Sequence, residues 1–351
     1  MKYILLFLLL FSSLNAMEIN ESLRVDGYAN IYSLSTTDES QKSNINGIDT
    51  SGGIQARYQV SDNILATGQI YFYEDNDYIK NIDFDVEAKW LYMDYYLGYD
   101  TTIRAGIFQF PIFSTSETST IGYTNTFTET PLTSYGANGY EDFTGGEVLK
   151  KYFYKDFEFL LQLSYGYSSN DLSTGQDVEE VSGDTDNLAG ITLKTNYKNL
   201  RLNIGYLQAT TEFDDYDEKI DFKTFAFEGE ADIYDYIFKV GYIKVELSDI
   251  FPDEQREYIS IEHQIKDFTP YIYYSNENLS FDDTTNNIFS SQKTITNNLN
   301  QKCSAGIRYD FSTNIALKLS YTYKLENTKY ERREDVEEHY DIVKAMINVI
   351  F

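Results

Sequence analysis

The chain has 351 residues, 56 of them Asp or Glu and only 28 Lys or Arg, and its formal net charge is −28. This acid excess argues against nucleic-acid binding, because the phosphate backbone would be repelled. Disordered chains are poor in aromatic residues, whereas this chain has 33 Tyr, 23 Phe and only 4 Pro, so we expect it to fold. Its single cysteine, Cys303, cannot form an internal disulfide, which leaves an extensive hydrogen-bond ladder to hold the fold together.

Residues 1–16, MKYILLFLLLFSSLNA, have the pattern of a secretory signal peptide. Lys2 precedes an apolar run at 4–11, and a polar stretch ends on the small residue Ala16. The run is too short to span a bilayer, although an uncleaved anchor is the alternative. We expect cleavage after Ala16 and a single exported domain at 17–351. No later segment approaches eighteen consecutive apolar residues, so no transmembrane helix is predicted.

Beyond residue 16 the sequence consists of runs of roughly ten residues in which apolar and polar side chains alternate. In FEFLLQLSYGY, residues 157–167, one parity holds only apolar or aromatic side chains, whereas Glu158, Gln162 and Ser164 share the other. The side chains of the first parity are Phe157, Phe159, Leu161, Leu163, Tyr165 and Tyr167. A strand directs alternate side chains to opposite faces, so such a run can face lipid on one side and water on the other. A soluble sandwich would show the same alternation. The signal peptide, the aromatic ends of the apolar faces and the connection lengths favour a membrane barrel.

We expect about sixteen strands in eight hairpins, an even number that permits antiparallel closure. The predicted strands are 23–32, 52–58, 64–73, 86–97, 102–108, 145–154, 157–167, 188–197, 200–209, 222–231, 236–247, 255–265, 269–278, 302–310, 314–325 and 337–351. Alternation is poor in 145–154, 236–247 and 255–265, so fourteen or eighteen strands remain possible. Short connections alternate with long polar ones, as the two ends of an outer-membrane barrel require.

Residues 109–145 form the longest predicted connection and contain Pro111 and Pro131. Loops of this length in a compact fold are usually functional or disordered. Six aromatic residues indicate that this loop packs against another part of the chain. They are Phe113, Tyr123, Phe127, Tyr135, Tyr140 and Phe143.

In the order and spacing of these features the sequence resembles the sixteen-stranded general porins of Gram-negative outer membranes. RVDGYANIY is similar to the first strand of that family, and GGIQARYQVSDNILATGQIYF to its second strand, turn and third strand. Phe351, preceded by apolar residues at alternate positions, resembles the signal read by the barrel-assembly machinery. The resemblance implies an all-β transmembrane antiparallel barrel, with short periplasmic turns, long extracellular loops and loop 109–145 folded into the lumen. It also implies a homotrimer in the lipid of the bacterial outer membrane.

By strand parity a set of basic residues faces the lumen, whereas loop 109–145 carries acids and no Lys or Arg. The basic wall residues are Arg24, Arg57, Arg104, Lys194, Arg201, Arg308, Lys318 and Lys344. The acidic loop residues are Glu117, Glu129, Glu141 and Asp142. The family pattern implies a constriction in which such acids and bases oppose one another and create a transverse field. For any one of these residues, a solvated charge or a pair with a neighbour is the alternative.

The predicted function is passive diffusion of small hydrophilic solutes and ions, with weak cation selectivity from the acid excess. One alternative is a substrate-selective channel, in which inward tyrosines form a track for sugars or aromatic solutes. These are Tyr28, Tyr32, Tyr71, Tyr73, Tyr271 and Tyr273. Another is a non-conducting structural or adhesive barrel. An enzyme is disfavoured, because His263 and His339 are the only histidines and no metal site, cofactor or nucleophile motif is visible.

Overall fold

The computed structural model describes residues 17–38, 43–75, 83–114, 116–129, 142–172, 181–213, 219–247, 253–280, 295–330 and 334–351. These ranges are almost entirely β-strand. The strands are β1 (Met17–Asn20), β2 (Leu23–Asp38), β3 (Ser43–Ser61), β4 (Ile64–Asp75), β5 (Asp83–Gly98), β6 (Thr101–Gln109), β7 (Asp142–Tyr154), β8 (Phe157–Leu172), β9 (Val181–Tyr197), β10 (Leu200–Phe213), β11 (Lys219–Ile233), β12 (Tyr236–Leu247), β13 (Asp253–His263), β14 (Phe268–Ser280), β15 (Ile295–Ser312), β16 (Ile315–Tyr330) and β17 (Val336–Ile350). Two short 3₁₀ turns, η1 (Ser116–Thr118) and η2 (Gly122–Thr124), lie between β6 and β7. Across these ranges no helix is long and apolar enough to cross a membrane.

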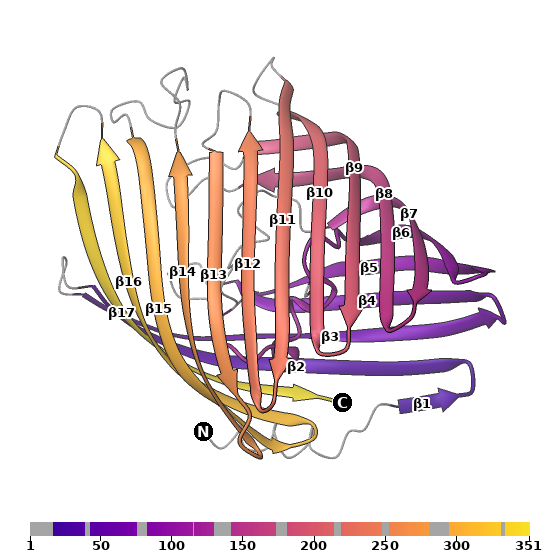
Figure 1. The fold of residues 1–351 in the computed structure, drawn as a ribbon, viewed down its shortest axis with the longest axis horizontal. Coiled ribbons are helices and arrows are strands. Elements are labelled where there is room, and N and C mark those ends of the chain that lie inside the picture. The colour runs from indigo at the N-terminus through magenta and orange to yellow at the C-terminus, as the bar shows by residue number, and fades with distance from the viewer. Residues whose placement is uncertain are drawn as a thin grey trace.

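Each strand from β2 to β16 pairs antiparallel with the next one, and β17 pairs with β2, so the sheet closes on itself (Figure 1). The closing ladder is joined at its end by hydrogen bonds between Gly27 and Phe351, of 2.8 and 2.9 Å. The predicted closed, sixteen-stranded, all-β barrel is therefore confirmed. A further short strand, β1, pairs with the start of β2 and was not predicted, because four residues show no readable alternation.

The strands extend further than predicted toward the long connections. β3 begins at Ser43 rather than 52, β9 at Val181 rather than 188, and β15 at Ile295 rather than 302. The backbone ladder continues there although both faces have become polar, so alternation no longer marks the strand. At the opposite end the strands are joined by tight turns. Tyr99 and Asp100 have φ of 51° and 56°, the conformation of a two-residue type I′ hairpin.

On most strands the apolar side chains face outward and the polar side chains face inward, as the alternation predicted. On β8, Tyr165 is 61% exposed and Leu163 45%, whereas Gln162 and Ser164 are buried. The same division holds on β10, where Leu202 and other apolar residues are exposed and Asn203 is buried. An apolar outer face is what a wall in contact with hydrocarbon requires.

The inward face is not polar throughout, which differs from the expectation of a wet interior. On the β9–β13 side, inward apolar residues form a buried core with the chain around the end of β6. Its members are Phe108, Phe110, Ile112, Phe113, Phe143, Leu188, Leu207, Ala209, Phe222, Ala226, Ile243, Val245 and Tyr258. This core explains why 236–247 alternated poorly: Ile243 and Val245 make the inner face of β12 apolar as well.

Three glycines stand side by side in neighbouring strands just before the chain leaves the wall. Gly106 of β6 pairs with Gly145 of β7, which pairs with Gly166 of β8. A Cβ on Gly145 would lie 2.2 Å from the carbonyl oxygen of Tyr165, and Gly106 has φ of 140°. Only glycine permits the backbones to approach this closely.

We expect Gly145→Ala to destabilise the barrel by about 1–3 kcal/mol, since the new methyl group must push two strands apart. The measurement is the urea midpoint of the protein refolded in detergent. Gly146→Ala is the matched control, because its Cβ would meet the nearest atom, the carbonyl oxygen of Arg104, at an ordinary 3.5 Å. Equal midpoints for the two variants would contradict this account of the glycine row.

Candidate functional site

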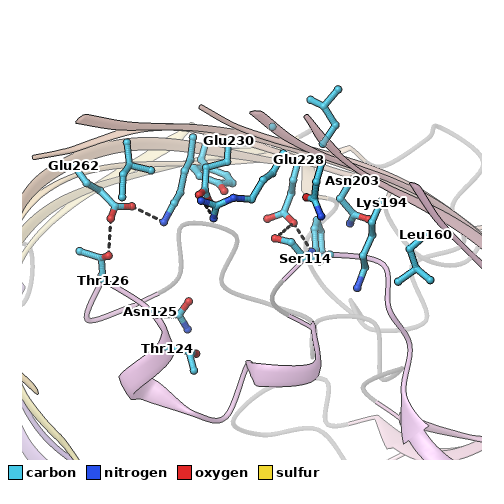
Figure 2. Close-up of a pocket in the computed structure, with 18 of the residues that line it drawn as sticks. Ser114, Thr124, Asn125, Thr126, Leu160, Lys194, Asn203, Glu228, Glu230 and Glu262 are labelled. Carbon is cyan, nitrogen blue, oxygen red and sulfur yellow. Dashed lines mark hydrogen bonds and ion pairs between the residues drawn. The ribbon is translucent and has the colours of Figure 1, made fainter. Parts of the chain in front are cut away.

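The described part of the long connection, residues 110–114 and 116–129, lies against the concave side of the wall (Figure 2). Its first turn is seated on two glycines. The ring of Phe110 lies where a Cβ of Gly190 would be, and Ile112 packs directly on Gly205. Asn203 donates from Nδ2 to the carbonyl oxygen of Ile112 at 2.8 Å. The apolar core therefore anchors this end of the segment.

Two wall carboxylates hold the middle of the segment. Glu228 of β11 accepts hydrogen bonds from the backbone N–H and the hydroxyl of Ser114, at 2.6 and 2.8 Å. Glu262 of β13 accepts one from the hydroxyl of Thr126 at 2.5 Å (Figure 2). The sequence reading considered basic wall residues only and missed both acids. They could have been found by applying the same parity rule to the acids of 222–231 and 255–265.

Two predicted wall bases bind the backbone of the segment. Lys318 donates from Nζ to the carbonyl oxygens of Gly122 and Phe127, at 2.6 and 3.1 Å, and its side chain is buried. Arg308 donates to the carbonyl oxygens of Tyr123 and Asn125, at 2.7 and 3.0 Å. These cations act as clamps on the segment rather than as charges facing open water.

Asparagine side chains attach the segment at the seam between β2 and β17. Asn30 donates to the carbonyl oxygen of Thr120 at 2.9 Å and accepts from the backbone N–H of Gly122 at 3.2 Å. Asn348 donates to Asn30 at 2.8 Å and is fully buried. The contact is so close that a Cβ on Gly122 would lie 2.3 Å from Nδ2 of Asn348.

Glu129, one of the predicted loop acids, lies between two lysines. Its carboxylate oxygens are 2.7 Å from Lys302 Nζ and 3.0 Å from Lys344 Nζ. Burial by itself raises the pKa of Glu129, but the ammonium groups of Lys344 and Lys302 outweigh burial and lower this pKa from 4.5 to about 2. Lys344 was a predicted wall base, and Lys302 was not.

Glu117, a second predicted loop acid, joins an ion-pair cluster around Arg104. The guanidinium of Arg104 lies 2.9 Å from Asp94, 3.1 Å from Glu117 and 3.7 Å from Glu147. It also stacks over the ring of Tyr92, 4.2 Å from the centroid. Three carboxylates and an aromatic face thus surround a single cation on the β5–β7 side.

Three of the predicted wall arginines pair with acids of the wall. Arg24 and Arg57 both bind Asp26, at 2.8 and 2.5 Å, near the short-turn end. Arg201 binds two wall acids, Glu230 and Asp232, each at 2.5 Å. Asp142 opens β7 and lies 4.0 Å from Lys89, and Glu141 lies outside the described residues. Glu117 and Glu129 therefore touch basic wall residues directly, while these three arginines pair within the wall.

A cavity of about 560 Å³ lies between the segment and the inner face of β7–β13, toward the short-turn end. Its charged lining residues are Lys151, Glu158, Lys194, Arg201, Glu228, Glu230, Lys239 and Glu262. Phe113 and Tyr258 from the apolar core also line it. The cavity is thus polar and charged along the wall strands but bounded by apolar residues where it meets the core.

No protein-family model and no curated protein matches the sequence. Solved structures do match it over almost the whole chain. One is OmpT, an outer membrane protein of Vibrio cholerae, in a trimer form, with 14% identity over 94% of this chain and 100% of that chain and a TM-score of 0.58. Another is the outer membrane channel DcaP of Acinetobacter baumannii, with 10% identity, coverage of 96% and 100%, and a TM-score of 0.63.

A third similar structure is an anion-selective porin from Comamonas acidovorans, with 10% identity, coverage of 94% and 99%, and a TM-score of 0.60. This chain has the porin fold. At such low identity the likeness concerns the fold alone. The fold alone therefore does not determine which solutes pass or which charges select them. Both depend on the interior residues described above.

We expect the contact of Glu129 with its two lysines to survive acidification to pH 4 and to fail near pH 2. A carboxyl whose pKa is lower in the folded state stabilises that state above the unfolded pKa, and the contribution is lost as pH falls through the folded pKa. A pKa of about 2 instead of 4.5 corresponds to roughly 3 kcal/mol. Single-channel conductance followed from pH 7 to pH 2 tests this.

Glu129→Gln is the matched variant for that titration. It removes the titrating group and keeps a side chain of the same size, so the step below pH 3 should disappear while the rest of the curve is retained. A wild-type step centred near pH 4.5 would show that the two lysines do not hold the carboxylate in its charged form.

Proposed function

We propose that the protein is an outer-membrane porin through which small hydrophilic solutes and ions diffuse passively. One observation carries the proposal: a closed ring of sixteen strands with an apolar exterior, inside which residues 110–114 and 116–129 bind the concave wall. A closed ladder leaves no unpaired backbone groups toward lipid. A segment held across part of the interior narrows the passage, which is the role that we propose for loop 109–145.

The proposed constriction combines predicted and newly found residues. Glu117 and Glu129 supply acids from the loop, and Arg104 and Lys344 supply the wall bases that they contact. Arg308 and Lys318 position the loop through its carbonyl groups. Arg24, Arg57 and Arg201 pair with acids of the wall and not with acids of the loop, so we assign them to the vestibule rather than to the constriction.

The cellular setting is part of the same proposal. We propose residues 1–16 as a cleaved signal peptide, the outer membrane as the location, and Phe351 as the residue recognised by the barrel-assembly machinery. A homotrimer is supported by the trimer form of OmpT, a protein of the same fold. No enzymatic role is proposed, because the structures similar to this chain include a channel and a porin.

A track of tyrosines for sugars is the weaker alternative. Tyr271 and Tyr273 pack edge-on against Phe127 of the loop, with ring centroids 5.0 and 5.5 Å away, and both are buried. Tyr28 is buried as well and donates to the hydroxyl of Thr120. These three tyrosines hold the loop and do not line an open path. Tyr71 and Tyr73 stack with ring centroids 5.4 Å apart and are not fully buried, so this pair keeps the arrangement that such a track would use.

Liposome swelling with sugars of graded size tests passive diffusion. We expect rates that fall smoothly with solute size and do not saturate. A double variant, Phe110→Ala with Ile112→Ala, removes both apolar anchors of the loop and should raise the size limit. Phe153→Ala on the 62%-exposed side chain is the control. Saturating uptake would favour a selective channel, and no uptake would favour a non-conducting barrel.

Reversal potentials in a salt gradient test the proposed weak cation selectivity. The acid excess attracts cations near the channel mouths, so permeability should favour K⁺ over Cl⁻ at about 0.1 M salt. At about 1 M, where the screening length falls to roughly 3 Å, this preference should decline. The anion-selective porin of the same fold shows that the fold does not decide the sign. A clear preference for chloride at low salt would contradict the proposal.

A further inference from the structure

Within the cavity described above, one row of side chains crosses three adjacent strands. Lys194 of β9 is paired in register with Asn203 of β10, and Asn203 with Glu228 of β11. All three side chains line the cavity, and Figure 2 shows them along the wall that faces the loop. The row thus runs from a cation through an amide to a carboxylate over two strand spacings, which is about 10 Å.

Four of the six other charged residues that line the cavity form ion pairs with one another. Arg201 and Glu230 form an ion pair at 2.5 Å, and Lys239 and Glu262 form another at 2.5 Å. In contrast, no hydrogen bond or close ion pair connects Lys194 to any residue in the described ranges, and its charge acts on Glu147 and Glu228 only at longer range. The Lys194 ammonium is therefore available to an anionic group that enters the cavity.

The opposite end of the row keeps acceptor capacity. Both hydrogen bonds from Ser114 go to one oxygen of Glu228, Oε2, which leaves Oε1 without a bond to the described part of the chain. Asn203 donates to Ile112, which fixes its amide orientation, and its buried Oδ1 has no partner among the described residues. Glu228 Oε1 and Asn203 Oδ1 are thus two acceptors on neighbouring strands near the loop. The Lys194 ammonium belongs to β9, the strand on the other side of Asn203.

We propose that this row binds zwitterionic solutes, such as amino acids and short peptides, with the solute carboxylate on Lys194 and its ammonium on Glu228. A solute with only a negative charge would be repelled by the carboxylate of Glu228, and a solute with only a positive charge would be repelled by Lys194. Only a zwitterion is attracted by both residues. The cavity of about 560 Å³ accommodates a dipeptide. The inference rests on the proposed function, because it supposes that solutes reach this cavity from the channel.

The test compares three probes of similar size on single channels in planar bilayers. Glycylglycine is the zwitterion, glycylglycinamide the cation and N-acetylglycylglycine the anion. We expect current fluctuations to report binding of glycylglycine at a dissociation constant about tenfold lower than that of either analogue, because only the zwitterion makes two charge-assisted contacts. Equal dissociation constants for the three probes would overturn the proposal.

Two variants should shift the preference in opposite directions, which misfolding cannot imitate. Lys194→Met should favour the cationic probe, and Glu228→Gln should favour the anionic probe, each by several fold over glycylglycine. Lys198→Met, at an exposed periplasmic-type turn, is the matched control and should keep the wild-type order. Variants that keep the order of the wild type would also overturn the assignment.

The two proposals fail in different ways. A protein that inserts and passes no current contradicts the porin function, whatever the probes do. Isothermal titration of the detergent-solubilised protein with the same three probes then still decides the zwitterion site, since it requires no conduction. A conducting channel that binds all three probes equally contradicts the zwitterion site alone.

Discussion

The pairing of every backbone N–H and C=O along a closed ladder is the constraint on which the rest of this structure depends. An open sheet edge cannot lie in hydrocarbon, so β17 must return to β2, and the ladder between them ends in the bonds of Phe351 to Gly27. Closure also sorts the side chains, because one parity of every strand must then face outward and the other inward. The exposed Leu and Tyr residues and the buried polar residues of β8 follow from that sorting.

Closure of the sheet does not determine which side chains fill the interior or how they bind the loop. On the β9–β13 side the inward residues form a packed apolar core, which seats Phe110 and Ile112 on glycines of the wall. On the β14–β17 side and at β2, polar and charged side chains bind the same segment through its backbone groups and through Glu129. The loop is thus held by apolar packing at its start and by hydrogen bonds and ion pairs further on.

Charges in this interior serve several purposes at once. Lys318 and Arg308 donate hydrogen bonds to carbonyl groups of the loop, so these two cations stabilise the position of the loop. Arg104 is surrounded by three acids and an aromatic ring. Lys194, in contrast, has no such commitment within the described ranges, and this difference separates a residue that holds the fold from one that can meet a solute.

The sequence by itself determined the barrel class: the expected segments, including the three that alternate poorly, are strands of the structure, and the outward apolar parity and the alternation of short and long connections appear there as well. Alternation is a local property, so it can be read without knowing which strands meet. Strand ends toward the long connections could not be read in this way, since the ladder there continues without an apolar face.

Only the tertiary structure decided which charges meet. Parity assigned Lys344 to the inner face, where it contacts Glu129, yet nothing in the sequence indicated Lys302 as the second partner, or Arg24 and Arg57 as partners of Asp26. Ion pairs depend on distances between strands and loops far apart in the chain, and a repeat of two residues carries no information about such distances. The apolar core inside β9–β13 could not be predicted either. An Ile or Val that faces the interior of a membrane barrel is buried only when the loop packs against it, and the sequence does not show that contact.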